Sequence, residues 1–513
     1  QMRGDYLTRW HDLFGKDGFR RLENEGAWFQ NCNYPYANTV TAAGHASLLT
    51  GTTPAHHGII GNDWYDRSTR TIVTSVGSAR YTRVTAGDTR KKARGASPQR
   101  LLVPTIGDVL KTATGNRARV IGVSLKDRAA ILPAGRHADA CYWFESSTGN
   151  FVSSTYYLQH LPDWVLTFNR AHRVDRWLGS HWARLRTDLD YTHYSGHGDF
   201  AATGQGANQG RTFPHPFPSK LGSPYYQAFY NSPLGNELLL DFAAHAIEAE
   251  HLGRHDVPDV LCISFSSNDA IGHSWGPDSH EVMDVTLRSD QIVRDLLRIL
   301  DERVGKGKYI LALTADHGVC PLPEFARQHG HEQAQRISTR DLFAGAREFL
   351  QKKYGKNARW IQATAEWWVY LNQQALHEQG LKSAEVEAAL ADWLKQQPGI
   401  QTAYTRTQLA GSLPANDAIG LKVQQSFYPE RSGDVYVVVK PYCLLTSSKT
   451  GTTHGTPYPY DTHVPLLVYG PGIRPGTRHE AVTPQAIAAI FAHALHVPPP
   501  ATATAPVPSG LFN

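Results

Sequence analysis

Short apolar and β-branched runs recur along the chain, and polar side chains follow each of them. The four clearest runs are Arg119–Ser124, Val257–Ser264, Lys308–Thr314 and His463–Tyr469. Continuous apolar runs of this length are typical of strands that are buried on both faces, as in a parallel sheet. The pattern therefore predicts four buried parallel strands.

A helical pattern lies between two of these runs. Within Val285–Leu300, one apolar face recurs at helical spacing, formed by Ile292, Val293, Leu296, Leu297 and Leu300. Strands that alternate with helices favour an α/β fold with a doubly wound, mostly parallel sheet flanked by helices. Ligands bind such sheets beyond the carboxyl ends of the strands, so we expect the functional site where polar residues follow the runs.

Two regions interrupt this alternation. Residues 145–235 are rich in Tyr, Trp, His and Gly, and residues 325–450 mix helical and strand patterns. We interpret both as insertions that cap the site. Residues 498–513 are rich in Pro and Ala, so they cannot pack a core and are expected to form an extended surface strap. The remaining segments form the α/β core: 1–144, 236–324 and 451–497.

The composition is that of a globular protein with a large core. The 513 residues are 41% hydrophobic, and 51 Lys and Arg against 46 Asp and Glu give a net charge of +5. The basic residues are dispersed, unlike those of a nucleic-acid-binding surface. No apolar run reaches the roughly 20 residues of a membrane-spanning helix. We therefore expect neither nucleic acid nor membrane as a partner, and the charge weakly favours an anionic substrate.

The cysteines are few and dispersed. A disulfide scaffold or a cysteine zinc site requires close pairs, which are absent from this sequence. One or two disulfides and at least one free thiol are compatible with the count. The five are Cys32, Cys141, Cys262, Cys320 and Cys443.

Three clusters of Asp and His follow predicted strands or loops. They are Asp269 with His273, the adjacent pair Asp316 and His317, and His454 in the segment GTTHG. Mixed Asp and His ligation suits zinc, and a spacing of four residues lets one helical turn direct both side chains of the first cluster at one ion. One such pair among 25 histidines is better explained as a hydrogen-bonded loop histidine. Three clusters together favour a metal site.

The segment TVTAAGHASLLTGTTPAHHGIIGNDWYD, residues 39–66, contains a candidate nucleophile. A helix that begins near His45 would place Thr41 at the positive end of the helix dipole, where an alkoxide and a phosphate are both stabilised. The alternative is that Thr41 is only a helix cap, which is the commoner role of a threonine in front of a helix.

Two basic residues, Lys126 and Arg128, lie just beyond a predicted strand in the segment VSLKDR. In an extended chain, side chains two residues apart point the same way, and two fixed cations suit a dianion. The alternative is an ordinary solvated charge pair.

Together and in this order, these segments resemble the alkaline phosphatase superfamily. The resemblance runs from Gln1 to about Gly470 and is specific for the threonine-nucleophile monoesterases of the bacterial periplasm, which are related to nucleotide pyrophosphatases and phosphodiesterases. It implies a zinc-dependent alkaline phosphatase that hydrolyses small phosphate monoesters through a phosphothreonine intermediate. It also implies a periplasmic or secreted protein, which we expect to be a monomer.

The resemblance assigns roles to individual residues. Thr41, four residues before His45, would be the nucleophile, and Asn62, 21 residues after Thr41, would bind a phosphoryl oxygen together with Lys126 and Arg128. Two zinc ions are implied. Their ligands would be Asp269, His273 and His454 for the first ion, and Asp316, His317 and Thr41 for the second.

One further ligand of the second zinc is implied by the resemblance. In that family an Asp immediately precedes a segment similar to Gln1–Tyr6. We therefore expect this Asp just before Gln1, removed by truncation, and a weakened second metal site is the alternative. Asp5 matches a structural position of the motif and does not replace the missing ligand. A removed signal peptide would fit the start at Gln1.

Two other functions remain open. A diester brings an extra substituent that needs an apolar pocket, so the aromatic residues of 145–235 leave a phosphodiesterase or nucleotide pyrophosphatase as the alternative. Ordinary packing is the simpler explanation of these residues, which include Trp177, Trp182, Tyr191 and Tyr194. The remote alternative is a non-catalytic zinc- or phosphate-binding protein, because a fold alone does not prove turnover.

Overall fold

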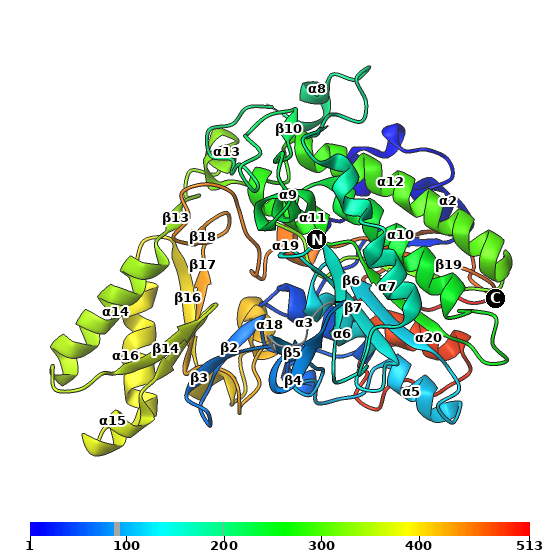
Figure 1. Ribbon diagram of the computed structural model, residues 1–513. Helices are drawn as coiled ribbons and strands as arrows, with labels where there is room; N and C mark the ends of the chain where they lie inside the picture. Colours follow the sequence, from blue (N-terminus) through cyan, green and yellow to red (C-terminus); the bar gives the residue numbers. More distant parts are fainter. Residues whose placement is uncertain (87–92, 197) are drawn as a thin grey trace.

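The computed structural model describes residues 1–86, 93–196 and 198–513 of the chain (Figure 1). Its largest sheet has the strand order β11-β6-β7-β8-β4-β5. The first three strands are parallel, and the other three are added antiparallel. Their bounds are β11 Val260–Ser264, β6 Val120–Ser124, β7 Ala140–Glu145, β8 Asn150–Ser154, β4 Gly77–Val84 and β5 Arg94–Ala96.

A second sheet has the order β12-β19-β1-β20 and completes the core. Strand β19 runs antiparallel to both of its neighbours, β12 and β1. The prediction that this run forms a parallel strand is therefore wrong, because a continuous apolar run indicates burial and does not specify direction. The bounds are β12 Leu311–Thr314, β19 Leu466–Tyr469, β1 Ala27–Phe29 and β20 Gly476–Arg478.

Helices cover both faces of the larger sheet. Along β6, Ile121 and Val123 pack in the same apolar core as Leu239 of α10, whereas Val120 packs in a second core with Ala130 of α6. Successive strand residues thus face opposite layers. The layer with α6 contains α6 Asp127–Ala134, α3 Thr41–Thr50 and α20 Ala486–Ala494, and the other contains α10 Pro233–Ala249, α11 Ser267–Trp275 and α12 His280–Leu300.

The helical face predicted for Val285–Leu300 lies in α12. Four of its five apolar residues are buried, and Leu300 is half-buried. No helix in the described residues is both long and apolar enough to cross a bilayer. The five cysteines are free thiols, so the disulfides that the sequence left open do not form.

The region between residues 336 and 445 forms a lobe beside the core (Figure 1). It contains a sheet with the order β14-β15-β17-β16. The two-residue turn between β14 and β15, Glu366 and Trp367, is the part of this lobe that matters for the site. The bounds of the lobe's main elements are α14 Thr339–Tyr354, β14 Ile361–Ala365, β15 Trp368–Leu371, α16 Ser383–Lys395, β16 Ile400–Thr405 and β17 Val435–Val439.

Two of the aromatic residues of 145–235, Trp182 and Tyr191, pack in the protein interior. Trp182 Nε1 and the Tyr191 hydroxyl each donate a hydrogen bond of 2.8 Å to the Asp284 carboxylate in α12, and both aromatic residues are buried. The carboxylate satisfies the polar atoms that their burial would otherwise leave unpaired. The simpler explanation of these two residues therefore holds.

The C-terminal tail differs in one respect from the expected strap. Thr504 N donates a hydrogen bond of 2.9 Å to Gly51 O, which holds the tail against the end of α3. Leu511, however, is fully buried and belongs to the main apolar core. The expectation that this segment cannot contribute to a core is wrong for that residue, because a single apolar side chain near a Pro-rich end can still insert.

Strands β11 and β12 face each other across a cleft of about 1090 Å³ that reaches Gln1. Both strands are half-buried over most of their length, whereas β6 and β19 are fully buried. The predicted complete burial of the runs containing β11 and β12 is therefore not met in the described residues, because their facing edges line this cleft.

Candidate active site

The polar residues that follow β6, β11 and β12 meet at one edge of the core. Strands β6 and β11 are parallel, and Ser264 pairs with Ser124 at their carboxyl ends. Lys126 lies just beyond the first of these ends, and Asp269 lies in the first turn of α11 beyond the second. Asp316 follows β12 and comes to the same edge. The topology thus concentrates the charged residues as expected for an α/β sheet.

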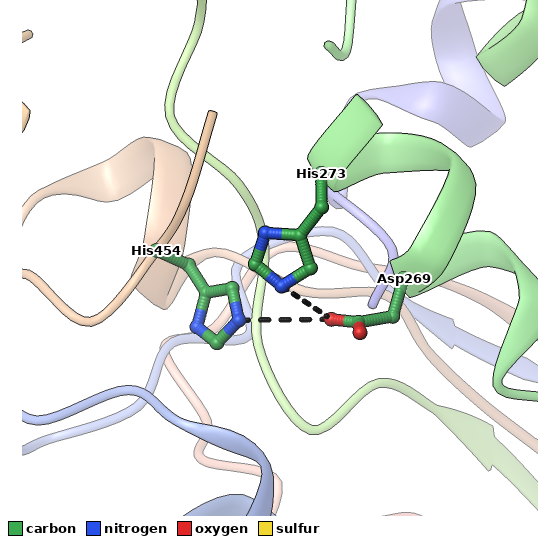
Figure 2. A group of neighbouring side chains, drawn as sticks. All are labelled: Asp269, His273 and His454. Atoms are coloured by element: carbon green, nitrogen blue, oxygen red, sulfur yellow. Dashed lines mark ion pairs between the residues drawn. The ribbon is translucent and has the colours of Figure 1, made fainter. Parts of the chain in front are cut away.

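Asp269, His273 and His454 form a group that could hold a metal ion. One ligand atom of each lies within 4.8 Å of the others. Asp269 Oδ1 is 3.4 Å from His273 Nε2 and 3.6 Å from His454 Nε2. Figure 2 shows both rings directed toward the carboxylate, with the aspartate and His273 on one helix and His454 on a distant segment. Asp269 and His273, which are four residues apart on α11, therefore point toward one position, as their spacing predicts.

The histidines of the site are oriented by the main chain. Nδ1 of His273 donates to Thr452 O, and Nδ1 of His454 donates to Thr39 O, both at 2.8 Å. Because a carbonyl oxygen only accepts, each Nδ1 carries the proton and each Nε2 presents a lone pair to the site. Such backbone contacts are the usual outer support of metal-binding histidines. The donor set and its orientation fit a metal ion.

Asp316, His317 and Thr41 form a second, smaller group beside the first. Asp316 Oδ2 is 3.2 Å from His317 Nε2, and Thr41 Oγ1 is 3.4 Å from the same nitrogen. The His317 and His454 rings stack with centroids 3.4 Å apart, so the two groups are adjacent. The structure therefore brings together the six predicted metal-ligating residues that lie within the chain.

The charges of the site match the binding of cations. Burial would raise the pKa of the Asp269 carboxyl, but Lys126 and the nearby histidines hold that pKa well below its ordinary range. His317 contributes in the same way to the low pKa of Asp316, which burial would otherwise raise. Burial lowers the pKa of His454 well below its ordinary value. Ionised carboxylates and neutral imidazoles are the forms that bind metals.

Helix α3 begins at Thr41, four residues earlier than the sequence suggested. Val40 is the N-cap residue, so Thr41 is the first helical residue and not the cap. Gly44 permits this arrangement, because a Cβ there would lie 2.3 Å from Asp316 O. Close packing of α3 against Asp316, just after β12, places the Thr41 hydroxyl beside His317, at the positive end of the α3 dipole.

Asn62 is fixed from two sides. Its side-chain Oδ1 accepts a hydrogen bond of 3.0 Å from Ala42 N, next to Thr41. Its main-chain N–H donates to Glu366 Oε1 at 2.7 Å. The side-chain oxygen is thus held by the start of α3, and the side-chain amide nitrogen has no hydrogen-bond partner among the described residues.

Lys126 has extended backbone, but Arg128 is helical, which corrects the prediction that both lie in extended chain. Lys126 is the N-cap residue of α6, and Arg128 is in its first turn, because the helix begins at Asp127. Lys126 Nζ donates to the Asp269 carboxylate. Arg128 Nε is buried without a hydrogen-bond partner among the described residues. The alternative of an ordinary solvated charge pair therefore does not describe these residues.

Two residues at the site were not predicted from sequence. Glu366 contacts Asn62 from a hairpin turn in the lobe, and Tyr230 is an electrostatic neighbour of the Lys126 ammonium. Neither residue lies after a predicted strand, at a predicted helix start or in a motif of the resemblance, which are the features that indicated the other site residues. The left-handed φ of 49° at Glu366 is invisible in the sequence as well.

Comparison with known proteins agrees with this geometry. Residues 1–463 match the profile of the type I phosphodiesterase / nucleotide pyrophosphatase family. The chain is 36% identical over 505 residues to the alkaline phosphatase PhoV of Synechococcus elongatus, covering 98% of this chain and 89% of that protein.

Two solved structures share the fold over the whole chain. The crystal structure of wild-type alkaline phosphatase PafA is similar with a TM-score of 0.92 and 33% identity, covering 100% of this chain and 97% of that one. A PafA variant, in which a threonine is replaced by serine and an asparagine, a lysine and an arginine by alanine, has a TM-score of 0.91, 32% identity and the same coverage. The chain therefore belongs to the type I phosphodiesterase / nucleotide pyrophosphatase family, within the alkaline phosphatase superfamily that its motifs resemble.

Proposed function

We propose that this protein is a zinc-dependent phosphate monoester hydrolase that acts through a phosphothreonine intermediate in the periplasm or outside the cell. The observation that carries the proposal is the position of the Thr41 hydroxyl. It lies at the N-terminus of α3 and 3.4 Å from His317 Nε2, at the boundary of the two Asp and His groups. Both sequence relatives and structural relatives named alkaline phosphatases support a monoester as the substrate.

Zinc fits the donor set of both groups. Asp269, His273 and His454 would hold one ion, and Asp316 and His317 would hold a second with Thr41. Zinc bound there would lower the pKa of the threonine hydroxyl and stabilise negative charge on the leaving-group oxygen.

A further aspartate just before Gln1 would complete the second set. The Gln1 ammonium donates to Asp316 Oδ1 at 2.8 Å, so a residue attached there would lie beside that carboxylate. The cleft between β11 and β12 also reaches Gln1, which gives a preceding segment a place against the core.

The reaction then needs two displacements at phosphorus. The Thr41 oxygen attacks the phosphorus, the bond from phosphorus to the leaving oxygen breaks, and the phosphoryl group is transferred to the threonine. Water next attacks the same phosphorus, the bond to Thr41 breaks, and inorganic phosphate leaves. The uncatalysed hydrolysis of phosphate monoesters is among the slowest known reactions, so the site must stabilise the charge of the transition state strongly.

Asn62, Lys126 and Arg128 would bind the non-bridging phosphoryl oxygens. The PafA variant supports this assignment, since its substituted threonine and asparagine are separated by the same 21 residues as Thr41 and Asn62. Its substituted lysine and arginine are two residues apart, as Lys126 and Arg128 are here. Arg128 Nε, which is buried and unpaired among the described residues, is suited to a phosphoryl oxygen.

The choice between a monoester and a diester can be tested with the two basic residues. We expect the wild type to prefer p-nitrophenyl phosphate over methyl p-nitrophenyl phosphate, in a zinc-dependent manner that a chelator abolishes. Alanine at both Lys126 and Arg128 should lower kcat/KM for the monoester by about 10²–10³-fold. The diester should lose less, because it brings one negative charge fewer. Steady-state kinetics with both substrates measure this difference.

The matched control is Arg340→Ala, which removes an 86% exposed arginine and should leave both rates unchanged. A preference of the wild type for the diester would instead assign the protein to phosphodiester or nucleotide hydrolysis, the activity for which its family is named. Absence of turnover with either substrate would favour a zinc- or phosphate-binding protein.

A further inference from the structure

The hairpin turn between β14 and β15 packs against two loops of the site, one containing Gly61 and the other Gly455. Glu366 and Trp367 form this turn. On one side, a Cβ at Gly61 would lie 2.3 Å from Glu366 Oε2. On the other side, a Cβ at Gly455, next to His454, would lie 2.9 Å from Trp367 Nε1. The two glycines allow the turn to approach both loops at once.

Glu366 holds the loop that ends in Asn62 directly through one carboxylate oxygen and indirectly, through Asn38, with the other. Oε1 accepts a hydrogen bond of 2.7 Å from Asn62 N, and Oε2 accepts one of 2.8 Å from Asn38 Nδ2. Asn38 Nδ2 also donates to Ile60 O at 2.6 Å. The carboxylate and Asn38 therefore hold the main chain of this loop at consecutive points.

This anchoring fixes the direction of the Asn62 side chain. Glu366 holds the main-chain nitrogen, while Ala42 N, at the start of α3, donates to the side-chain oxygen at 3.0 Å. Because the main-chain nitrogen and the side-chain oxygen of Asn62 are both hydrogen-bonded, the orientation of its side-chain amide nitrogen is fixed. The backbone strain at Glu366, whose φ of 49° is rare for a residue with a side chain, is the kind of distortion that persists where surrounding contacts enforce it.

We propose that Glu366 is a positioning residue for phosphate binding, which acts through Asn62 and couples the lobe to the active site. The inference rests on the proposed function of Asn62 as a phosphoryl ligand. Glu366 itself does not touch the substrate. Without its carboxylate, the loop would be free to move, and the Asn62 amide would lose its fixed orientation toward the phosphoryl group.

A double-mutant cycle between Glu366 and Asn62 tests the proposal. Asn62→Ala should lower kcat/KM for p-nitrophenyl phosphate by about 10²–10³-fold, and Glu366→Ala should lower it by about 10–100-fold, as the loss of supporting contacts commonly does. In the double variant, Glu366→Ala should cost no more than about twofold, because the group that it positions has been removed. Glu366→Gln keeps one accepting oxygen and should fall between the wild type and Glu366→Ala.

The same cycle is measured on the dissociation constant for inorganic phosphate by calorimetry, with thermal unfolding as a check that every variant folds. Glu348→Ala, which removes an exposed carboxylate on α14, should change neither quantity. Fully additive losses in both quantities would overturn the proposal. If the wild type bound phosphate without hydrolysing the ester, the proposed function would fail, and coupling in the phosphate cycle would still support the role of Glu366.

Discussion

Replacing Thr41 by alanine should reduce kcat for p-nitrophenyl phosphate by at least about four orders of magnitude, as the removal of a covalent nucleophile does in other enzymes. In the proposed mechanism the threonine oxygen is the one protein group that forms a bond to phosphorus, so no neighbouring side chain substitutes for it. The groups that hold the phosphoryl oxygens remain in place. Affinity for inorganic phosphate should therefore be retained in part, which calorimetry measures beside the steady-state rate.

Thr41→Ser is the matched control, because it restores a hydroxyl at the same position and removes only a methyl group. We expect it to recover much of the lost rate. A phosphorylated chain should be trapped by acid quench of the wild type during turnover and be absent from Thr41→Ala. A wild-type rate in Thr41→Ala would show that this residue is not the nucleophile.

The convergence of the site could be predicted because it depends on periodicity and topology. The runs that contain β6, β11 and β12 could be predicted as strands, and the charged residues after the parallel neighbours β6 and β11 had to meet at one sheet edge. Asp269 and His273 needed only a helical turn to point the same way. Strand direction was less accessible, as β19 shows, because antiparallel and parallel strands that are buried on both faces look alike in sequence.

Contacts that depend on tertiary placement could not be predicted in this way. Glu366 and Asn62 are 304 residues apart, and no local pattern links a hairpin turn of the lobe to a loop beside α3. The extended conformation expected at Lys126 and Arg128 is wrong at the second residue for a different reason. Their spacing was interpreted for extended chain, whereas α6 begins between them at Asp127. One helical boundary therefore gives the two residues different backbone conformations.

Neutralising Asp269 should remove bound metal and most of the activity. Its Oδ1 lies between the Nε2 atoms of three histidines, at 3.4 Å from His273, 3.6 Å from His454 and 3.7 Å from His317. Asp269→Asn keeps the shape of the side chain and removes the charge that draws a cation to this point. Metal ions supply several kcal/mol of charge stabilisation, so kcat/KM should fall by at least about a thousandfold.

Elemental analysis of the purified protein separates the loss of metal from a loss of folding. The wild type should bind zinc at both groups, and Asp269→Asn should lose the ion held with His273 and His454. Treatment of the wild type with a chelator should abolish activity, and added zinc should restore it. Asp256→Asn, which alters a carboxylate that is 73% exposed, is the control. An unchanged zinc content in Asp269→Asn would exclude this carboxylate as a ligand and would leave its burial beside Lys126 as a structural ion pair, whose loss would then appear as a lower unfolding temperature.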